Sequence, residues 1–286
     1  MQVTHVGVVG AGLMGSGIAE VVARSGYTTH VVELNEEALE RGRKRTAKSL
    51  ATAVERGKLT DEERSAIEGR MSFSTSLDDL TPCTVVIEAI IEQLPEKRMV
   101  FEHLDRILPE GALLATNTSS LPIIEVASAT KRQDRVVGIH FFNPAPVMKL
   151  VELVRSIATS DAAFADAKTF AESLGKTVIE AQDRAGFVVN LLLIPFLTHA
   201  VRMLEAGHAT KEDIDTGIKY GCGHPMGPLE LADLVGLDTT LFVCETLYQE
   251  YGEPEYMPPP LLKRMVAAGY LGRKSGRGFY DYSTHA

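Results

Sequence analysis

Along the first two thirds of the chain, segments with the apolar pattern of a strand alternate with segments that have the apolar pattern of a helix. Short apolar runs that end in turn residues predict buried strands, and longer stretches with apolar residues at helical spacing predict helices between them. The strand-like runs lie at residues 3–9, 28–34, 71–74, 84–89, 112–115, 135–141, 149–154 and 176–179. This alternation predicts an α/β fold with a doubly wound sheet of the Rossmann type.

Only helical patterns remain after residue 182. The first of them runs from Gly186 to Glu205 and is apolar almost all round, so we expect a buried helix, packed within its own chain or against a second subunit. Further helices are expected at residues 211–219, 229–234 and 239–251, and a last one ends near Gly269. With 286 residues the chain is long enough for two domains. We place a Rossmann-type domain at residues 1–182 and an all-α domain at residues 183–286.

A glycine-rich turn, Gly10-Ala11-Gly12-Leu13-Met14-Gly15, follows the first strand and opens the first helix. In this context glycines allow a tight turn, the close approach of a pyrophosphate to the backbone, and close packing of helix on strand. We therefore expect a dinucleotide to bind at Gly10, Gly12, Leu13, Met14 and Gly15.

Glu33 ends the second strand, 18 residues beyond Gly15. At this spacing an acid accepts hydrogen bonds from the adenosine ribose of a bound dinucleotide. Its charge would repel a 2′-phosphate, and residues 34–37 contain no Arg that could receive one. The sequence thus predicts NAD rather than NADP as the cofactor.

The most promising chemistry lies where an apolar strand ends in His140 and Asn143-Pro144 forces a turn. The next strand carries one charged residue, Glu152, among Leu and Val, and a carboxylate in such a place requires a partner. A His that is oriented by a carboxylate can take the proton of a hydroxyl, which suits alcohol oxidation. The alternative is a structural His–Glu pair that braces two strands.

Polar residues gather at the ends of other strands. Glu92 and Lys97 flank the turn into a helix, where contact with a cofactor competes with simple surface charge as the explanation. Ser120 precedes Leu121-Pro122 and is expected to cap a helix, which leaves Asn117 and Ser119 for a ligand. Asn190 is the polar exception in the apolar helix, and its partners could be backbone or substrate.

Seven Lys and Arg residues stand against the single acid Glu55 between positions 41 and 58. Such a run is either a solvated helix face or a landing site for a phosphorylated substrate handle such as coenzyme A. The basic, glycine-rich tail at residues 272–280 could likewise reach a phosphate or merely close its domain.

Composition narrows the possibilities. The net charge of −9 argues against nucleic acid as a partner and gives no membrane-surface signal. No apolar run approaches a transmembrane span, and the first strand leaves no room for a signal peptide, so a cytoplasmic protein is expected. The three scattered cysteines fit reduced, buried thiols rather than a disulfide framework or a zinc site. No metal is expected, since no His/Asp/Glu cluster has ligand spacing.

Several motifs together resemble the short 3-hydroxyacyl-CoA dehydrogenases, especially the bacterial 3-hydroxybutyryl-CoA dehydrogenases, over nearly the whole length of the chain. Besides the glycine-rich turn, they are Asn117-Thr118-Ser119-Ser120, His140-Phe141-Phe142-Asn143-Pro144, Gly186-Phe187-Val188-Val189-Asn190, His224-Pro225-Met226-Gly227-Pro228 and Gly276-Arg277-Gly278-Phe279-Tyr280. One departure is Leu191, where the family usually has Arg, which affects a local contact and leaves the catalytic set intact.

The resemblance implies NAD-dependent oxidation of a 3-hydroxyacyl-CoA, most simply (S)-3-hydroxybutyryl-CoA, and the reverse reduction of acetoacetyl-CoA. His140 would be the general base and Glu152 its orienting partner. The remaining roles that it implies are substrate contacts for Ser119, Asn190 and Asn143, coenzyme A contacts for Ser49 and Arg56, and NAD contacts for Glu33, Glu92, Lys97, Asn117 and Lys274.

Two alternatives remain open on the sequence. Relatives on the same scaffold oxidise sugar acids such as gulonate without coenzyme A, and lens proteins with this fold are chiefly structural. The basic helix disfavours a sugar-acid dehydrogenase that does not use coenzyme A. The presence of both His140 and Glu152 disfavours a purely structural protein. The apolar helical domain suggests a homodimer, although burial within one chain would give the same pattern.

Overall fold

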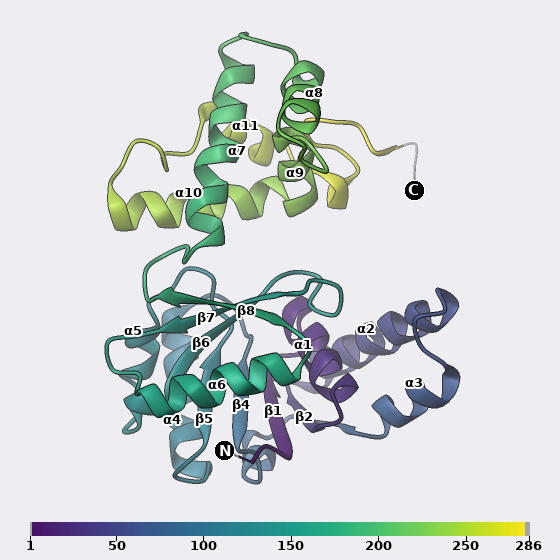
Figure 1. Cartoon of the computed structure of the whole chain (residues 1–286), viewed down its shortest axis with the longest axis vertical. Coiled ribbons are helices and arrows are strands. Elements are labelled where there is room, and N and C mark those ends of the chain that lie inside the picture. The colour runs from purple at the N-terminus through teal and green to yellow at the C-terminus, as the bar shows by residue number, and fades with distance from the viewer. Residues whose placement is uncertain (1, 284–286) are drawn as a thin grey trace. The chain divides into compact units, whose positions relative to one another are not determined.

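The computed structural model describes residues 2–283 of the chain. The chain divides after Arg184 into two compact units (Figure 1). The first unit contains all eight strands of one sheet together with helices, and the second contains helices α7 to α11. The expected fold class, a Rossmann-type sheet followed by an all-α unit, is confirmed.

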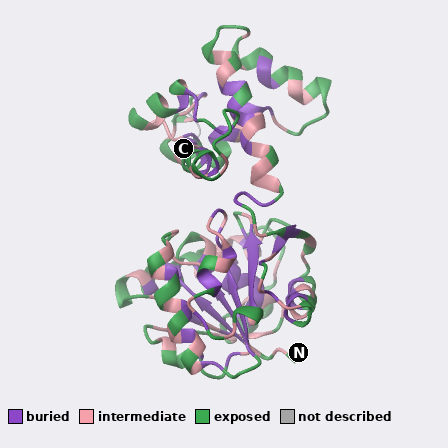
Figure 2. Cartoon of the chain, turned by 90° about the vertical axis from the view of Figure 1, so that its left-hand side faces the viewer, coloured by how far each residue is buried: buried purple, intermediate pink, exposed green. Residues whose placement is uncertain are grey.

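The sheet of the first unit has the order β3-β2-β1-β4-β5-β6-β7-β8. All neighbouring strands are parallel except β6 and β7, which are antiparallel. Apolar runs without internal charges explain why the central strands can be buried on both faces (Figure 2). The strands are β1 (His5–Val9), β2 (Thr28–Val32), β3 (Met71–Ser74), β4 (Val85–Glu88), β5 (Leu113–Thr116), β6 (Val136–Phe141), β7 (Leu150–Arg155) and β8 (Thr177–Gln182).

Helices cover both faces of this sheet (Figure 1). Apolar residues of α1 and α6 form one core cluster with the strands, including Ile139. A Cβ atom on the next residue back, Gly138, would point toward Ile123 of α5. Because successive residues of a strand face opposite sides of the sheet, α5 lies on the face opposite to α1 and α6, where it contacts α4. The helices of this unit are α1 (Leu13–Arg24), α2 (Glu36–Glu55), α3 (Asp61–Glu68), α4 (Leu94–Ile107), α5 (Ile123–Ala127) and α6 (Asp161–Ser173), with short 3-10 turns η1 (Leu77–Leu80) and η2 (Gln133–Arg135).

Local signals place several of these helices where the sequence predicts them. The Asn35 side chain accepts a hydrogen bond from the Ala38 N–H and begins α2. Thr60 and Glu63 exchange both hydrogen bonds of a capping box at the start of α3. These contacts satisfy N–H groups that a helix start leaves open.

The second unit packs five helices around its own apolar core. Two buried carboxylates organise it. Asp233 accepts from the N–H groups of Phe279 and Tyr280 and so holds the tail, while Asp215 accepts from those of Leu229 and Glu230 at the start of α9. The helices are α7 (Val189–Glu205), α8 (Lys211–Gly221), α9 (Pro228–Val235), α10 (Leu237–Tyr251) and α11 (Pro260–Ala267), followed by the 3-10 turn η3 (Arg273–Ser275).

The long apolar helix begins later than its sequence predicts. It starts at Val189 rather than at Gly186, because Gly186 and Phe187 adopt left-handed backbone conformations with φ of 80° and 48°. Within the single chain it is not buried all round, since Leu192 is 71% exposed and Met203 is 44% exposed, and burial against a second subunit stays a prediction.

Two of the three cysteines are buried thiols as expected, but Cys222 is exposed, which corrects that part of the prediction. It lies just after α8, at the start of a loop whose residues 222–225 are all exposed. Within residues 2–283, no helix is long and apolar enough to cross a membrane, and no group of His, Cys, Asp and Glu side chains could hold a metal ion.

Candidate active site

His140 and Glu152 face each other across the antiparallel strands β6 and β7, as register partners. The His140 Nδ1 lies 2.7 Å from Glu152 Oε2. Glu152 is fully buried and His140 is 7% exposed. The carboxylate can accept a hydrogen bond from Nδ1–H, which fixes the tautomer and leaves Nε2 as the basic nitrogen. The pair expected from the sequence is therefore present with the geometry of a general base and its orienting group.

The glycine-rich turn lies at the carboxyl end of β1. Gly10 has φ of 98°, and a Cβ atom on Gly15 would lie 1.9 Å from the Gly10 carbonyl oxygen, so both positions require glycine. Gly12 is the N-cap residue of α1, has open space around its missing Cβ, and provides no side-chain cap. The start of α1 thus presents unobstructed backbone N–H groups, which fits a pyrophosphate.

Glu33 is tied to the glycine-rich turn. Its Oε2 accepts from the Ala11 N–H at 2.7 Å, and its Oε1 accepts from the Leu34 N–H at 2.7 Å. Ala11 is also contacted by the Arg45 side chain, which donates to the Ala11 carbonyl oxygen at 2.9 Å. Glu33 was predictable from its spacing, but the role of Arg45 was not, because Arg45 lies 34 positions beyond Ala11 and reaches it only in the folded chain.

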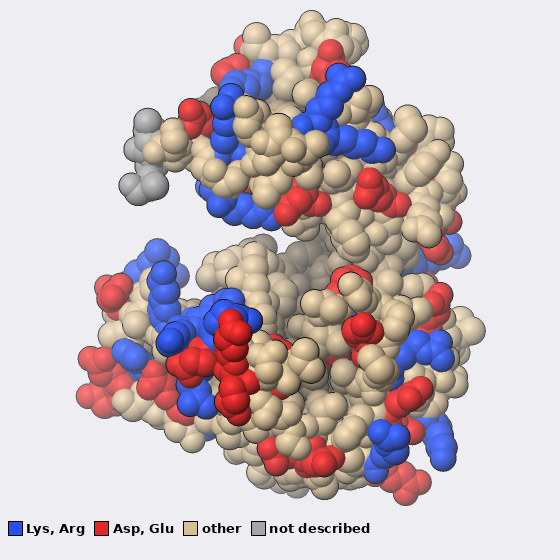
Figure 3. All heavy atoms as spheres, turned by 180° about the vertical axis from the view of Figure 1, so that it is seen from behind, with Lys and Arg blue, Asp and Glu red and all other residues tan. Residues whose placement is uncertain are grey.

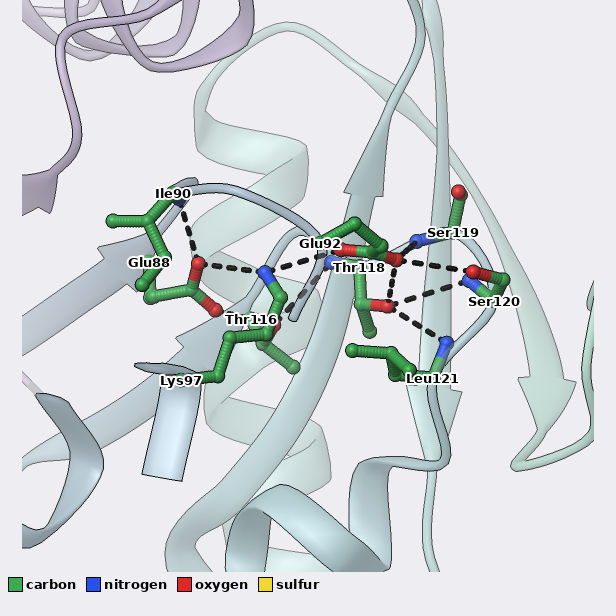
Figure 4. Close-up of polar contacts among 9 residues, drawn as sticks. All are labelled: Glu88, Ile90, Glu92, Lys97, Thr116, Thr118, Ser119, Ser120 and Leu121. Atoms are coloured by element: carbon green, nitrogen blue, oxygen red, sulfur yellow. Dashed lines mark hydrogen bonds and ion pairs between the residues drawn. The ribbon is translucent and has the colours of Figure 1, made fainter. Parts of the chain in front are cut away.

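Lys97 lies in a buried polar cluster at the carboxyl ends of β4 and β5 (Figure 4). Its Nζ lies 2.7 Å from Glu88 Oε1 and 3.2 Å from Glu92 Oε2, and its side chain is 1% exposed. The surface-charge interpretation of Lys97 is therefore wrong. The sequence analysis did not single out Glu88, although it carries the signal that identified Glu152, an acid in an otherwise apolar strand.

Glu92 holds the turn that contains Ser119. Its Oε1 accepts from the Ser119 N–H at 3.0 Å, from the Ser120 hydroxyl at 3.2 Å and from the Thr118 hydroxyl. Burial alone would raise the pKa of Glu92, but the nearby Lys97 ammonium and these donors hold the pKa below its usual value. The Ser119 hydroxyl points away from the cluster and is half-buried (Figure 4).

The expected cap at Ser120 is wrong. Helix α5 begins at Ile123, and Asp183 caps it by accepting from the N–H groups of Ile123 and Ile124 at 2.7 and 2.9 Å. Ser120 instead donates to Glu92. Asn117 is also engaged, because its Oδ1 accepts from the Phe141 N–H at 2.9 Å, directly beside His140.

The basic run on α2 is partly neutralised. Arg41 and Lys44 form ion pairs with Glu37 and Glu40 of the preceding turn, and Figure 3 shows blue and red side chains mixed over α2 and α3. The other five members of the run form no ion pair within residues 2–283. Arg43 lies over the Phe73 ring and Arg45 donates to the Ala11 carbonyl oxygen. Lys48, Arg56 and Lys58 are exposed, and Ser49 is half-buried.

The remaining predicted residues are more scattered. Asn143 is exposed in the loop after His140. Asn190 and Lys274 belong to the second unit, where Asn190 lies half-buried in the first turn of α7. Lys274 Nζ lies 2.5 Å from Asp238 Oδ1.

Within the first unit, the predicted residues converge at one edge of the sheet. Gly10, Glu33, the Lys97 cluster, Ser119 and His140 all lie at or just after the carboxyl ends of parallel strands, where α/β sheets bind their ligands.

Comparison with known proteins agrees with this arrangement. The NAD binding domain of the 3-hydroxyacyl-CoA dehydrogenases matches residues 5–184, and the C-terminal domain of the same family matches residues 186–282. The chain belongs to the 3-hydroxyacyl-CoA dehydrogenase family.

Individual members of the 3-hydroxyacyl-CoA dehydrogenase family are similar along their full length. A 3-hydroxybutyryl-CoA dehydrogenase of Mycobacterium tuberculosis is 54% identical over 98% of this chain and 99% of its own. A probable 3-hydroxybutyryl-CoA dehydrogenase of Bacillus subtilis is 48% identical over 99% and 98%. The crystal structure of (S)-3-hydroxybutyryl-CoA dehydrogenase PaaH1 from Ralstonia eutropha matches with a TM-score of 0.93 and 45% identity over 98% and 99%.

Proposed function

We propose that this protein is an NAD-dependent dehydrogenase that oxidises (S)-3-hydroxyacyl-CoA, with (S)-3-hydroxybutyryl-CoA as its substrate, and catalyses the reverse reduction of acetoacetyl-CoA. The observation that carries the proposal is the buried pair of His140 and Glu152, joined at 2.7 Å at the ligand-binding edge of the sheet. Full-length similarity to 3-hydroxybutyryl-CoA dehydrogenases supports the choice of substrate.

In this proposal His140 Nε2 takes the proton of the substrate's 3-hydroxyl group, since Nδ1 is engaged by Glu152. The Glu152 carboxylate stabilises the imidazolium that forms, without taking up the proton itself. Bound NAD would supply the hydride acceptor for C3 of the substrate. Ser119 would hydrogen-bond the reacting oxygen, and Asn143, in the loop after His140, would contact the substrate. Asn190 of the second unit is a further proposed substrate contact.

The cofactor-binding residues of this proposal that belong to the first unit lie at or just after the strand ends. The N–H groups of Leu13 and Met14 at the start of α1 would bind the pyrophosphate, in the space left open at Gly12. Glu33 would bind the adenosine ribose. Glu92, Lys97, Asn117 and Lys274 would contact the remainder of NAD.

The handle of the substrate would bind at α2. Arg56 and Ser49, together with Lys48 and Lys58, offer positive charge and a hydroxyl without a competing ion pair in the described part of the chain. Phosphate and pyrophosphate groups of coenzyme A fit this chemistry.

The second unit is proposed to form a homodimer. Exposed apolar side chains on its helices support dimerisation, among them Leu192, Leu234 and Phe242 at 71%, 49% and 46% exposure. Light scattering after size exclusion tests this proposal. A mass near 62 kDa, twice the chain mass of 31.1 kDa, is expected, and Leu192→Glu should lower it if α7 lies in the interface.

The activity itself is tested by following NADH consumption. Acetoacetyl-CoA should be reduced rapidly with NADH, and far more slowly with NADPH. Free acetoacetate is the control for the handle, and L-gulonate with NAD tests the sugar-acid alternative. Turnover of gulonate without turnover of acetoacetyl-CoA would contradict the proposed function.

A further inference from the structure

Glu88 is a fully buried carboxylate at the last position of β4, and the proposed reaction assigns it no role. Its two oxygens accept three hydrogen bonds. Oε1 accepts from the Ile90 N–H and from Lys97 Nζ, each at 2.7 Å, and Oε2 accepts from the Thr116 hydroxyl at 2.7 Å. Burial of a charged carboxylate at 0% exposure costs a large desolvation free energy. The residues that contact Glu88 therefore indicate what it does.

Two chains of contacts lead from Glu88 to the turn at residues 118–120 (Figure 4). The first runs through Lys97, which lies 3.2 Å from Glu92 Oε2, and Glu92 accepts from the Ser119 N–H at 3.0 Å. The second runs through Thr116, whose hydroxyl oxygen accepts from the Thr118 N–H at 3.3 Å. Both chains therefore end on the backbone around Ser119.

We propose that Glu88 is a positioning residue, which acts through Lys97 and Thr116 to fix the turn from which Ser119 meets the substrate. This inference rests on the proposed function, because it assumes that Ser119 contacts the reacting group. Lys97 provides one positive charge for two carboxylates, and Glu88 fixes the ammonium that contacts the second oxygen of Glu92, so Glu88 supports the Glu92 side chain that holds Ser119. A displacement of about 1 Å at a reacting group is enough to slow chemistry strongly.

The test uses Glu88→Gln and Thr116→Val, each nearly isosteric with the residue that it replaces. Glu88→Gln removes the negative charge that pairs with the Lys97 ammonium, which weakens the first chain of contacts. Its NH₂ group replaces one acceptor oxygen, and if it faces Thr116 the hydroxyl there must accept rather than donate, which alters the second chain. Thr116→Val interrupts only the second chain. Thr84→Val at the other end of β4 is the matched control, because the buried Thr84 hydroxyl makes no hydrogen bond within residues 2–283.

A second control separates positioning from loss of stability. Phe170→Leu removes core volume from α6 and lowers the urea midpoint. With acetoacetyl-CoA, we expect kcat of Glu88→Gln to fall at least about tenfold and that of Thr116→Val at least about threefold, with the KM of both variants and the NADH Kd of Thr116→Val within about fivefold of wild type. Amide hydrogen exchange at residues 116–121 should accelerate in Glu88→Gln. Both controls should keep wild-type kcat.

The outcomes are distinguishable. Wild-type kcat and unchanged exchange in a folded Glu88→Gln would overturn the positioning role while leaving the proposed function intact. If Glu88→Gln does not fold, Thr116→Val decides, and unchanged kcat there would overturn the role. A wild-type protein that binds NADH but does not reduce acetoacetyl-CoA would overturn the proposed function itself, and this inference with it.

Discussion

The imidazole of His140 and the carboxylate of Glu152 are joined across an antiparallel strand pair, and each side chain points from a register position directly opposite the other. This placement depends on the reversal of chain direction between β6 and β7, the one antiparallel junction in the eight-stranded sheet of the described chain. Because neither side chain projects from a flexible loop, the 2.7 Å contact is fixed by the backbone ladder itself.

Replacement of either member should therefore remove catalysis and leave cofactor binding. We expect His140→Gln to lower kcat by about 10²–10⁴-fold, the range associated with general base catalysis, and Glu152→Gln to lower it less. Stopped-flow turnover and NADH titration measure the two effects separately. Glu180→Gln, an exposed carboxylate on the neighbouring β8, is the control. Near-normal turnover in His140→Gln would contradict the assignment of the base.

Cofactor choice should depend on the charge of Glu33. In Glu33→Ser the repulsion of a 2′-phosphate is removed while Arg45 stays beside Ala11, so the preference for NADH over NADPH should fall about tenfold or more, equivalent to about 1.4 kcal/mol. The ratio of kcat/KM values measures this preference. Glu36→Ser, three residues along the chain, should leave it unchanged. An unaltered ratio in Glu33→Ser would exclude this carboxylate as the determinant.

The lowered pKa of Glu92 predicts how stability depends on pH. An acid whose pKa is lower in the folded chain than in the unfolded chain stabilises the fold above the unfolded value of about 4.3, and that contribution disappears as the pH falls through the folded value. Glu92→Gln should thus be less stable than wild type by about 1–3 kcal/mol at neutral pH. Urea unfolding at several pH values should show this difference shrinking below about pH 4. A constant difference would show that the charge of Glu92 is not responsible.

The thiols should differ sharply in reactivity. Burial raises the pKa of the Cys83 and Cys244 thiols to about 12, whereas Cys222 is exposed. Ellman's reagent at pH 8 should modify one thiol rapidly in the native protein and three after denaturation, because the thiolate is the reactive form. Cys222→Ser should abolish the rapid phase. Two or more fast thiols in the native protein would indicate that the buried cysteines become accessible.

The elements predicted best from the sequence are those in which one local signal is sufficient. The strand at residues 71–74 is observed with the same bounds, and the capping box at Thr60 and Glu63 forms as expected. The pairing of His140 with Glu152 was also predictable, since a lone charge in an apolar strand requires a partner nearby.

What the sequence did not reveal depends on contacts between distant segments. Lys97 at a helix start is ordinarily solvated, and it is buried here only because Glu88 and Glu92 reach it from β4 and the loop beyond. Gly42 in the middle of α2 has no local purpose, yet a Cβ atom there would lie 2.4 Å from the Ala11 Cβ. Ser120 was expected to cap a helix, but Asp183 arrives from 60 residues away and takes that place.

The buried cluster of Glu88, Lys97 and Thr116 also limits which single substitutions the protein can accept during evolution. Loss of Glu88 alone removes one of the two carboxylates that pair with the Lys97 ammonium. Loss of Lys97 alone leaves Glu88 and Glu92 without the cation that both contact. Each single substitution should therefore destabilise the protein. Replacement of the whole set by apolar residues would remove that penalty, but only through several simultaneous changes. We therefore expect positions 88 and 97 to be inherited as a unit, and a homologue that differs at one to differ at the other.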